Sequence, residues 1–506
     1  MSMTEQGFES AQKADTAQSN LQHSPSDNEL KRSGNHTILS PQPSDDPRDP
    51  LNWPQSKKIS ILAALSVTSF AALGSPLAGL LELTPQAETY GKSVSQVSYG
   101  TSIALAGMVV WAFALLPLSH AIGRTSTMFW STSLVLVCNV WAASMTKPSQ
   151  YAPYLVSRFF AGFGATVPSA LGPRILLDLF FIHERGRAFS VFTLPYLLGT
   201  LAMPTVGCFV ASQTDWPVMF WWTIPFLGLA LTLTVAFMEE TGFEREGQRK
   251  YPQQPKAFVA NRIATFLPRN NVVPACTLAE TATFLLEPVK TGGYGFELIK
   301  LAEGESQQLS PFVFYVPFSP DKSALVSISG WIGILGAFLY TQLVSDRVPI
   351  WICKKHGGIW RNEYRLQCMW FPGLIVLPIG LGIFGVSVRY HWSPALLALS
   401  YFMTMFGANA ATSIISNHLS ESFPQFPAEC GNFLSAYRLV LGLASGFFIQ
   451  PWAGKVGVAW TFGTAALMSV FAFLFIILLL WKGPAIRKIT LTPNLGPSDK
   501  GSKSML

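Results

Sequence analysis

The chain has 506 residues, of which 49% are hydrophobic and only 12% are charged. Soluble globular domains carry about 25% charged residues, so this composition excludes an ordinary soluble protein and indicates a membrane protein. The formal net charge of +7 does not indicate nucleic-acid binding, because the lysines and arginines sit in short blocks between apolar runs, as in the cytoplasmic loops of membrane proteins. The six cysteines lack CxxC spacing, so we expect no metal site, no cofactor and no disulfide framework.

The N-terminal tail is polar. Residues 1–45 are rich in Ser, Gln, Asp and Pro, a composition that cannot bury a core and predicts disorder. We therefore place a disordered cytoplasmic tail at 1–52, and interpret Trp53 as an interfacial anchor and Lys57 and Lys58 as cytoplasmic markers. No cleavable signal peptide is visible, so the first apolar helix is expected to direct membrane insertion.

Six apolar segments follow, each long enough to cross a hydrocarbon layer about 30 Å thick. They cover residues 59–81, 97–118, 127–146, 152–180, 188–211 and 217–238. The cations fall in alternate connections: Arg124, then Arg185 and Arg187, then several in 239–270. The positive-inside rule therefore places the N-terminus and the loop 239–270 in the cytoplasm.

The second half repeats this plan less regularly. Its clear apolar segments are 323–344, 370–388, 394–415, 431–452 and 458–481. The connection 345–369 and the tail 483–506 carry cations and are expected to be cytoplasmic. Since one clear segment then lies between two cytoplasmic loops, a further crossing has to lie within 271–322.

That further crossing has no good candidate. The best run, 272–289, is interrupted by Glu280, Glu287 and Pro288, and 290–310 is charged and contains glycine. Two interpretations stay open: a divergent, partly polar seventh span shielded by its neighbours, or a span partly missing from this version of the sequence, for instance through a misplaced exon boundary. Both predict the least regular packing between 271 and 322.

Arg158 lies about seven residues inside the fourth segment, roughly 10 Å along a helix. A guanidinium stays ionised and is costly in hydrocarbon, so we expect it to face the bundle interior or a wet cavity. Small residues surround it and predict that a second helix approaches closely: Ala161, Gly162, Gly164 and Ala165.

Two other features belong to this part of the chain. In the fifth segment, Gly199, Pro204 and Gly207 loosen a helix where neighbours can satisfy its backbone. Near the inner end of the fourth segment, Arg174 and Asp178 are adequately explained by snorkelling toward the interface.

Several short motifs occur in a fixed order along the chain. They are DPRDPLNWPQSKK at 46–58 and the stretches 117–124, 155–164, 199–207, 287–288, 345–347, 358–366 and 417–421. In order and placement, they resemble the major facilitator superfamily, specifically its fungal twelve-span drug:proton antiporter branch, over about 46–482. Three positions depart from that pattern: His120 where an acid is usual, Met203 in place of a glycine, and Cys208 where a second glycine is common.

The resemblance implies an all-α polytopic membrane protein with two six-helix halves around a central cavity. The halves are expected at 53–238 and 271–482, joined by the central cytoplasmic loop 239–270. The resemblance also implies that Arg158 takes part in proton coupling. The alternative is a structural charge bonded to helix carbonyls.

The resemblance further implies gating loops around Gly123 and Arg124, and around Asp346 and Arg347. In such loops, charge–dipole contacts and salt bridges hold the cytoplasmic side closed. The alternative is that these four are turn residues and topology markers. Gly199, Pro204 and Gly207 are implied to form a hinge in the fifth helix, while the substrate-binding residues stay unassigned.

We therefore expect a transporter that moves a small organic molecule, such as a drug-like compound or secondary metabolite, by alternating access and proton-coupled efflux. Alternatives are an uptake symporter or facilitator of the same fold, and an inactive or sensor-like membrane protein. An enzyme is not expected, because HExxH, GxSxG and P-loop spacings are absent from the sequence. The expected partners are the substrate, protons and the lipid bilayer. We expect a monomer in the plasma membrane, with vacuolar or vesicular membranes as alternatives and both termini cytoplasmic.

Overall fold

The computed structural model describes residues 43–80, 83–243, 257–267, 320–345, 347–355, 363–422 and 427–491. Within these ranges the ordered elements are helices, and no strand is present. Eight of the described helices are long and apolar enough to cross a membrane. The predicted all-α, polytopic class is confirmed.

The first part of the chain forms a bundle whose helices match the six predicted apolar segments. Its elements are η1 (Pro50–Asn52), α2 (Gln55–Gly74), η2 (Ser75–Leu80), α3 (Leu83–Tyr90), α4 (Val94–Ile122), α5 (Arg124–Ser144), η3 (Pro148–Gln150), α6 (Tyr151–Leu179), α7 (Ile182–Ala211), α8 (Val218–Trp221) and α9 (Thr223–Phe237). A short helix, α10 (Phe258–Phe266), follows and packs against α5.

The second part supplies helices at each of the five segments expected there. Its elements are α13 (Pro320–Tyr340), η5 (Thr341–Ser345), α14 (Arg347–Lys355), α15 (Glu363–Leu366), η6 (Gln367–Met369), η7 (Trp370–Val376), α16 (Leu377–Arg389), α17 (Pro394–Ser422), α18 (Pro427–Val456) and α19 (Val458–Leu491). The predictions made for a seventh span concern 271–322, of which 271–319 lie outside the described residues. The predicted boundaries of the halves, loop and tails stay predictions.

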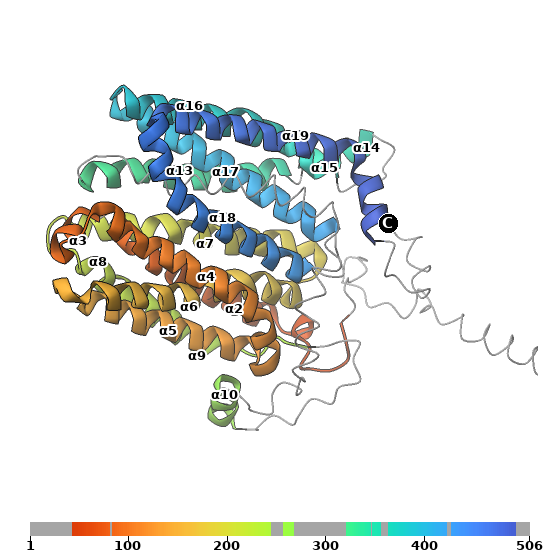
Figure 1. Ribbon diagram of the computed structural model, residues 1–506. Helices are drawn as coiled ribbons and strands as arrows, with labels where there is room; N and C mark the ends of the chain where they lie inside the picture. Colours follow the sequence, from red (N-terminus) through yellow and green to blue (C-terminus); the bar gives the residue numbers. More distant parts are fainter. Residues whose placement is uncertain are drawn as a thin grey trace, which may run out of the picture.

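The two parts lie against each other as two groups of helices with similar axis directions (Figure 1). The orange and yellow helices α2 to α9 form one group, and the green and blue helices α13 to α19 form the other. Contacts between the groups join α7 to α13, and α18 to α4 and α6. We call the first group the N-terminal half and the second the C-terminal half.

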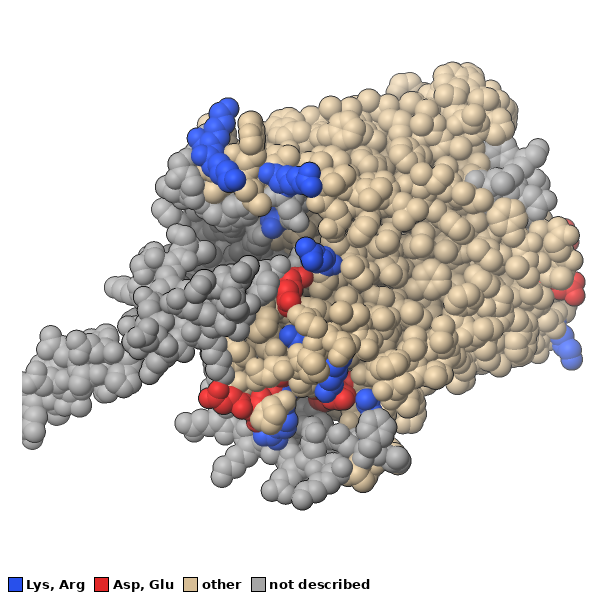
Figure 2. Space-filling view, turned by 180° about the vertical axis from the view of Figure 1, so that it is seen from behind, with Lys and Arg blue, Asp and Glu red and all other residues tan. Residues whose placement is uncertain are grey.

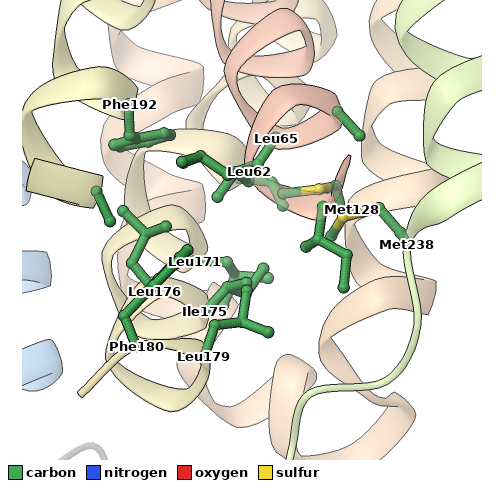
Figure 3. Packing of buried hydrophobic residues seen from close by; sticks show 14 of the residues in the cluster. Leu62, Leu65, Met128, Leu171, Ile175, Leu176, Leu179, Phe180, Phe192 and Met238 are labelled. Atoms are coloured by element: carbon green, nitrogen blue, oxygen red, sulfur yellow. The ribbon is translucent and has the colours of Figure 1, made fainter. Parts of the chain in front are cut away.

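Apolar side chains fill the inside of each half. Figure 3 shows one such cluster, in which Leu65 of α2, Met128 of α5 and Leu171 of α6 lie close together. Lipid tails are as apolar as these side chains, so close packing rather than transfer from water holds such helices together. The position of each helix is therefore set by how its surface fits its neighbours.

Charged side chains gather at the ends of the bundle. Figure 2 shows blue and red side chains at the two ends and a broad tan region between them. Ion pairs and hydrogen bonds join charged residues at the starts of α2, α5 and α7, and we call the end of the bundle where they lie the charged end. This distribution is typical of a protein that crosses a hydrocarbon layer.

Candidate functional site

Arg158 is sealed inside the N-terminal half, with 1% of its surface exposed. Its guanidinium donates from Nη1 to the Asn139 Oδ1 of α5 at 3.2 Å, and from Nη2 to the carbonyl oxygen of Pro76 in η2. The guanidinium carbon also lies 4.7 Å from the centre of the Phe220 ring. Three neutral groups from three other elements therefore hold this charge, and its position agrees with the high cost of exposing a charge to lipid.

The approach of neighbouring helices positions α6 around Arg158. A Cβ atom at Gly162 would collide with the carbonyl of Ala104 on α4, and one at Gly107 with the carbonyl of Phe159 on α6. On the other side, a Cβ at Gly164 would stand 2.5 Å from the carbonyl oxygen of Ser131 on α5. The close helix approach predicted from the small residues is confirmed.

Aromatic residues close the end of the half nearest to Arg158. The Tyr154 hydroxyl donates to the Gln86 Oε1 at 3.0 Å, and the Tyr90 hydroxyl donates to the Met145 carbonyl at 2.6 Å. The Tyr90 and Tyr154 ring centres lie 5.5 Å apart, and Trp216 packs beside both. These contacts separate the guanidinium from the solvent at this end of the bundle.

Arg124 stands at the charged end and pairs with Asp178 of α6. Glu240 accepts hydrogen bonds from the backbone nitrogens of Arg124 and Thr125, each at 3.2 Å, where the first turn of α5 leaves such donors unpaired. The prediction that snorkelling explains Asp178 was wrong, because its carboxylate is 16% exposed and ion-paired across two helices. Sequence reasoning also missed Glu240.

Gly123 makes the turn between α4 and α5 and has a φ angle of +91°. Residues with a Cβ atom rarely adopt this conformation, so glycine is the residue that fits here. The turn places the Arg124 side chain against Asp178 and aligns the start of α5 with Glu240. Gly123 therefore has a clear structural role, and its part in gating stays a prediction.

Further polar contacts join the helix ends of the N-terminal half at the charged end. Lys57 Nζ pairs with the Glu239 carboxylate at 2.5 Å, and Arg262 of α10 lies 3.6 Å from the same carboxylate. Gln55 at the start of α2 donates to Glu184 of α7 at 2.6 Å. These contacts fix the ends of α2, α7 and α9 relative to one another within the N-terminal half, and they attach α10 to it.

The second predicted gating loop is only partly visible. Asp346 lies outside the described residues, and Arg347 is exposed at the start of α14. Among the described residues, no contact joins Arg124 to Arg347. The gating role of the pair formed by Asp346 and Arg347 stays a prediction.

The predicted hinge residues lie in α7, which is one continuous helix. A Cβ atom at Gly199 would collide with the carbonyl of Phe70 on α2, so Gly199 allows two backbones to touch. Met203 is buried where a family member would have glycine, and it packs opposite Gly74 of α2. Pro204 is inside the same helix, and Gly207 faces Trp222. The hinge role of Gly199, Pro204 and Gly207 stays a prediction.

Arg438 is a polar residue that sequence reasoning passed over. It lies in α18, and its Nη2 donates to the Tyr196 hydroxyl of α7 at 3.0 Å. This hydrogen bond joins the two halves. The signal that singled out Arg158 was present here as well, because Arg438 is a guanidinium seven residues inside the predicted segment 431–452.

Comparisons with known proteins agree with this architecture. The profile of the Major Facilitator Superfamily matches residues 59–425. The chain is 25% identical to Efflux pump radE of Floropilus chiversii, over 88% of this chain and 83% of that protein. It is also 25% identical to MFS transporter cpaT of Aspergillus oryzae, over 82% of this chain and 84% of that protein.

The fold is also that of solved transporters. The structure of the xylose transporter XylE from E. coli in a partially occluded, inward-open conformation superposes with a TM-score of 0.60 at 16% identity, and covers 84% of this chain and 98% of that one. The family match covers most of the chain, and its members are transporters. This chain belongs to the Major Facilitator Superfamily.

Proposed function

We propose that this protein exports a small organic compound from the cytoplasm in exchange for protons. The family makes it a transporter of small molecules by alternating access. The proposal of outward movement is supported by the fungal relatives, among which Efflux pump radE aligns over 88% of this chain. The observation that carries the coupling is the charge of Arg158, held inside one half by neutral partners.

In the proposed cycle the two halves rock against each other around a midplane site. The surfaces that rearrange are those between α7 and α13, and between α18 and α4. The contacts of Arg124, Glu239 and Glu240 lie within the N-terminal half, so this half moves as one body. The charged end, with the start of α2, faces the cytoplasm in this proposal.

Arg158 does not itself release a proton, because a guanidinium stays charged at accessible pH. It acts in this proposal through its field and through the contacts it makes. It holds the Pro76 carbonyl of η2, and η2 in turn packs against α7. A change in the field around the guanidinium is thereby passed to the helix that contacts the C-terminal half.

An uptake symporter of the same fold is the second candidate. The observation that favours it is the loss of two glycines from the fifth-helix pattern, at the buried Met203 and Cys208. XylE, whose fold this chain shares, is described as a proton:xylose symporter. Direction and coupling separate the two candidates.

The test uses inside-out membrane vesicles that contain the full chain, with an imposed inward-acidic pH gradient. Three dyes are offered: rhodamine 6G as a cation, Nile red as a neutral compound and fluorescein as an anion. Export in exchange for protons predicts that at least one dye accumulates, and that a protonophore abolishes the accumulation. Accumulation that persists after the protonophore identifies a facilitator, and accumulation only in right-side-out vesicles identifies an uptake symporter.

A further inference from the structure

The hydrogen bond between Arg438 and Tyr196 lies deep in the bundle. Arg438 is eleven residues inside α18 and Tyr196 is fourteen residues inside α7, counted from Pro427 and Ile182. At 1.5 Å per residue these positions lie roughly 16 Å and 21 Å along their helices. Both depths fall within a hydrocarbon layer, and the two side chains come from opposite halves. A charge at such a position by default marks a functional site.

Two further hydrogen-bond donors lie on α7 and α13, which pack against each other at this interface. The Tyr196 oxygen accepts from Arg438, and a tyrosine hydroxyl in this arrangement retains its own proton to donate. Trp331 of α13 packs in a cluster to which Leu194 and Leu197, on either side of Tyr196, also contribute. Its indole nitrogen is buried and makes no hydrogen bond to the described parts of the chain. Buried donors ordinarily have partners, so these groups indicate that an acceptor binds here.

The distribution of charged residues in the described helices also favours binding of an anion. In the described helices, every Asp and Glu lies within two residues of a helix end. Arg158 and Arg438, by contrast, lie well inside α6 and α18. The charges well inside these described helices are therefore positive, and a guanidinium in a medium of low dielectric constant attracts anions.

We propose that Arg438, Tyr196 and Trp331 bind the carboxylate or phenolate group of the transported compound, which is therefore an organic anion. A guanidinium binds such groups through two parallel hydrogen bonds, and the aromatic side chains accommodate the apolar body of the compound. Because Tyr196 and Arg438 belong to opposite halves, an anion that displaces their mutual hydrogen bond also loosens the contact between the halves. The assignment rests on the proposed transport function and adds the class of substrate to it.

The test compares three ligands that share one ring system: 2-naphthoate, 2-naphthamide and 2-naphthylmethylammonium. Equilibrium binding to the purified full chain in detergent is measured at pH 7 by competition with radiolabelled naphthoate and by thermal shift. We expect naphthoate to bind at least tenfold more tightly than the ammonium compound. Arg438→Gln is expected to weaken naphthoate binding at least tenfold and to change naphthamide binding less than threefold.

Matched variants separate binding from folding. Arg438→Lys keeps the charge and is expected to retain part of the affinity, and Tyr196→Phe and Trp331→Phe are each expected to weaken naphthoate binding about threefold by the loss of one donor. Arg389→Gln is the control, because Arg389 is exposed at the end of α16 beside Tyr390. If Arg438→Gln does not fold, the two phenylalanine variants decide.

Several results overturn the assignment. They are equal binding of the three ligands, no naphthoate binding at all, and unchanged naphthoate binding in the folded Arg438 and Tyr196 variants. Binding at equilibrium needs no gradient and has no direction. Selective naphthoate binding without proton-driven transport would therefore refute the proposed export and leave this site standing, whereas export of rhodamine 6G with no selectivity for naphthoate would do the reverse.

Discussion

Replacing Arg158 by methionine separates its structural contribution from its proposed part in coupling. Methionine fills much of the same volume, but the Pro76 carbonyl and the Asn139 amide oxygen each lose the hydrogen bond that Arg158 donates to them. An orphaned buried polar group costs about 1–3 kcal/mol. Removing a buried charge offsets part of this cost. We therefore expect Arg158→Met to lower the free energy of unfolding by about 2 kcal/mol, which leaves the protein folded.

Arg158→Ala adds a cavity, which costs about 2–3 kcal/mol more. Arg158→Lys keeps a point charge that can pair with one acceptor but not with both. The expected order of stability is therefore arginine, then lysine and methionine, then alanine. Asn139→Leu is a matched variant, because it removes one partner of the guanidinium and leaves the charge in place.

The assay measures two activities of each folded variant in proteoliposomes. Counterflow exchanges labelled for unlabelled substrate and needs no proton movement, whereas accumulation needs the pH gradient. We expect Arg158→Met to retain counterflow and to lose gradient-driven accumulation, and Asn139→Leu to retain both. If Arg158→Met accumulates substrate normally at normal expression, Arg158 is a structural charge and the coupling argument is refuted.

Three further predictions concern packing and capping. Gly123→Ala forces a Cβ atom into a φ of +91° and should destabilise the protein by about 1–3 kcal/mol, measured by chemical unfolding; an unchanged midpoint would contradict the turn argument. Glu240→Gln removes a negative charge from the start of α5 and should cost about 0.5–1 kcal/mol, with a smaller cost in high salt; a loss that does not depend on salt would exclude the electrostatic explanation. Gly199→Leu should abolish folded expression, because the backbone of α2 touches α7 at this glycine. Gly228 faces open space, so Gly228→Leu should express normally. Equal expression of the two variants would refute close packing as the role of Gly199.

The sequence was sufficient to locate the long apolar helices, but not the short helices α3, α10 and α14, which lie in stretches read as connections. Apolar runs long enough to span a membrane have few alternatives to a helix, because backbone polar groups in lipid must be satisfied internally. The interior position of Arg158 followed from the cost of exposing a guanidinium to hydrocarbon, and the small residues around Gly162 predicted the contact with Ala104.

The partners of these residues were not accessible from the sequence. One of the two acceptors of Arg158 is the backbone carbonyl of Pro76, and every residue type carries such a carbonyl. Snorkelling toward the interface was the explanation offered for Asp178, because it lies near a helix end, but the register between α5 and α6 places it against Arg124. The contact between Arg438 and Tyr196 depends on how two distant helices cross. Periodicity determines which face of a helix is buried, but not the register between helices.

Alternating access requires the two halves to move against each other during transport. Tyr99 of α4 and Phe447 of α18 have ring centres 5.9 Å apart and belong to opposite halves, whereas Phe70 and Phe226 are 6.0 Å apart within one half. Each pair is replaced by two cysteines in a background without the native cysteines, and transport is measured before and after oxidation and after reduction. Alternating access predicts that the cross-link between Tyr99→Cys and Phe447→Cys stops transport reversibly, while the link between Phe70→Cys and Phe226→Cys leaves it unchanged. Full transport with the halves cross-linked would contradict alternating access.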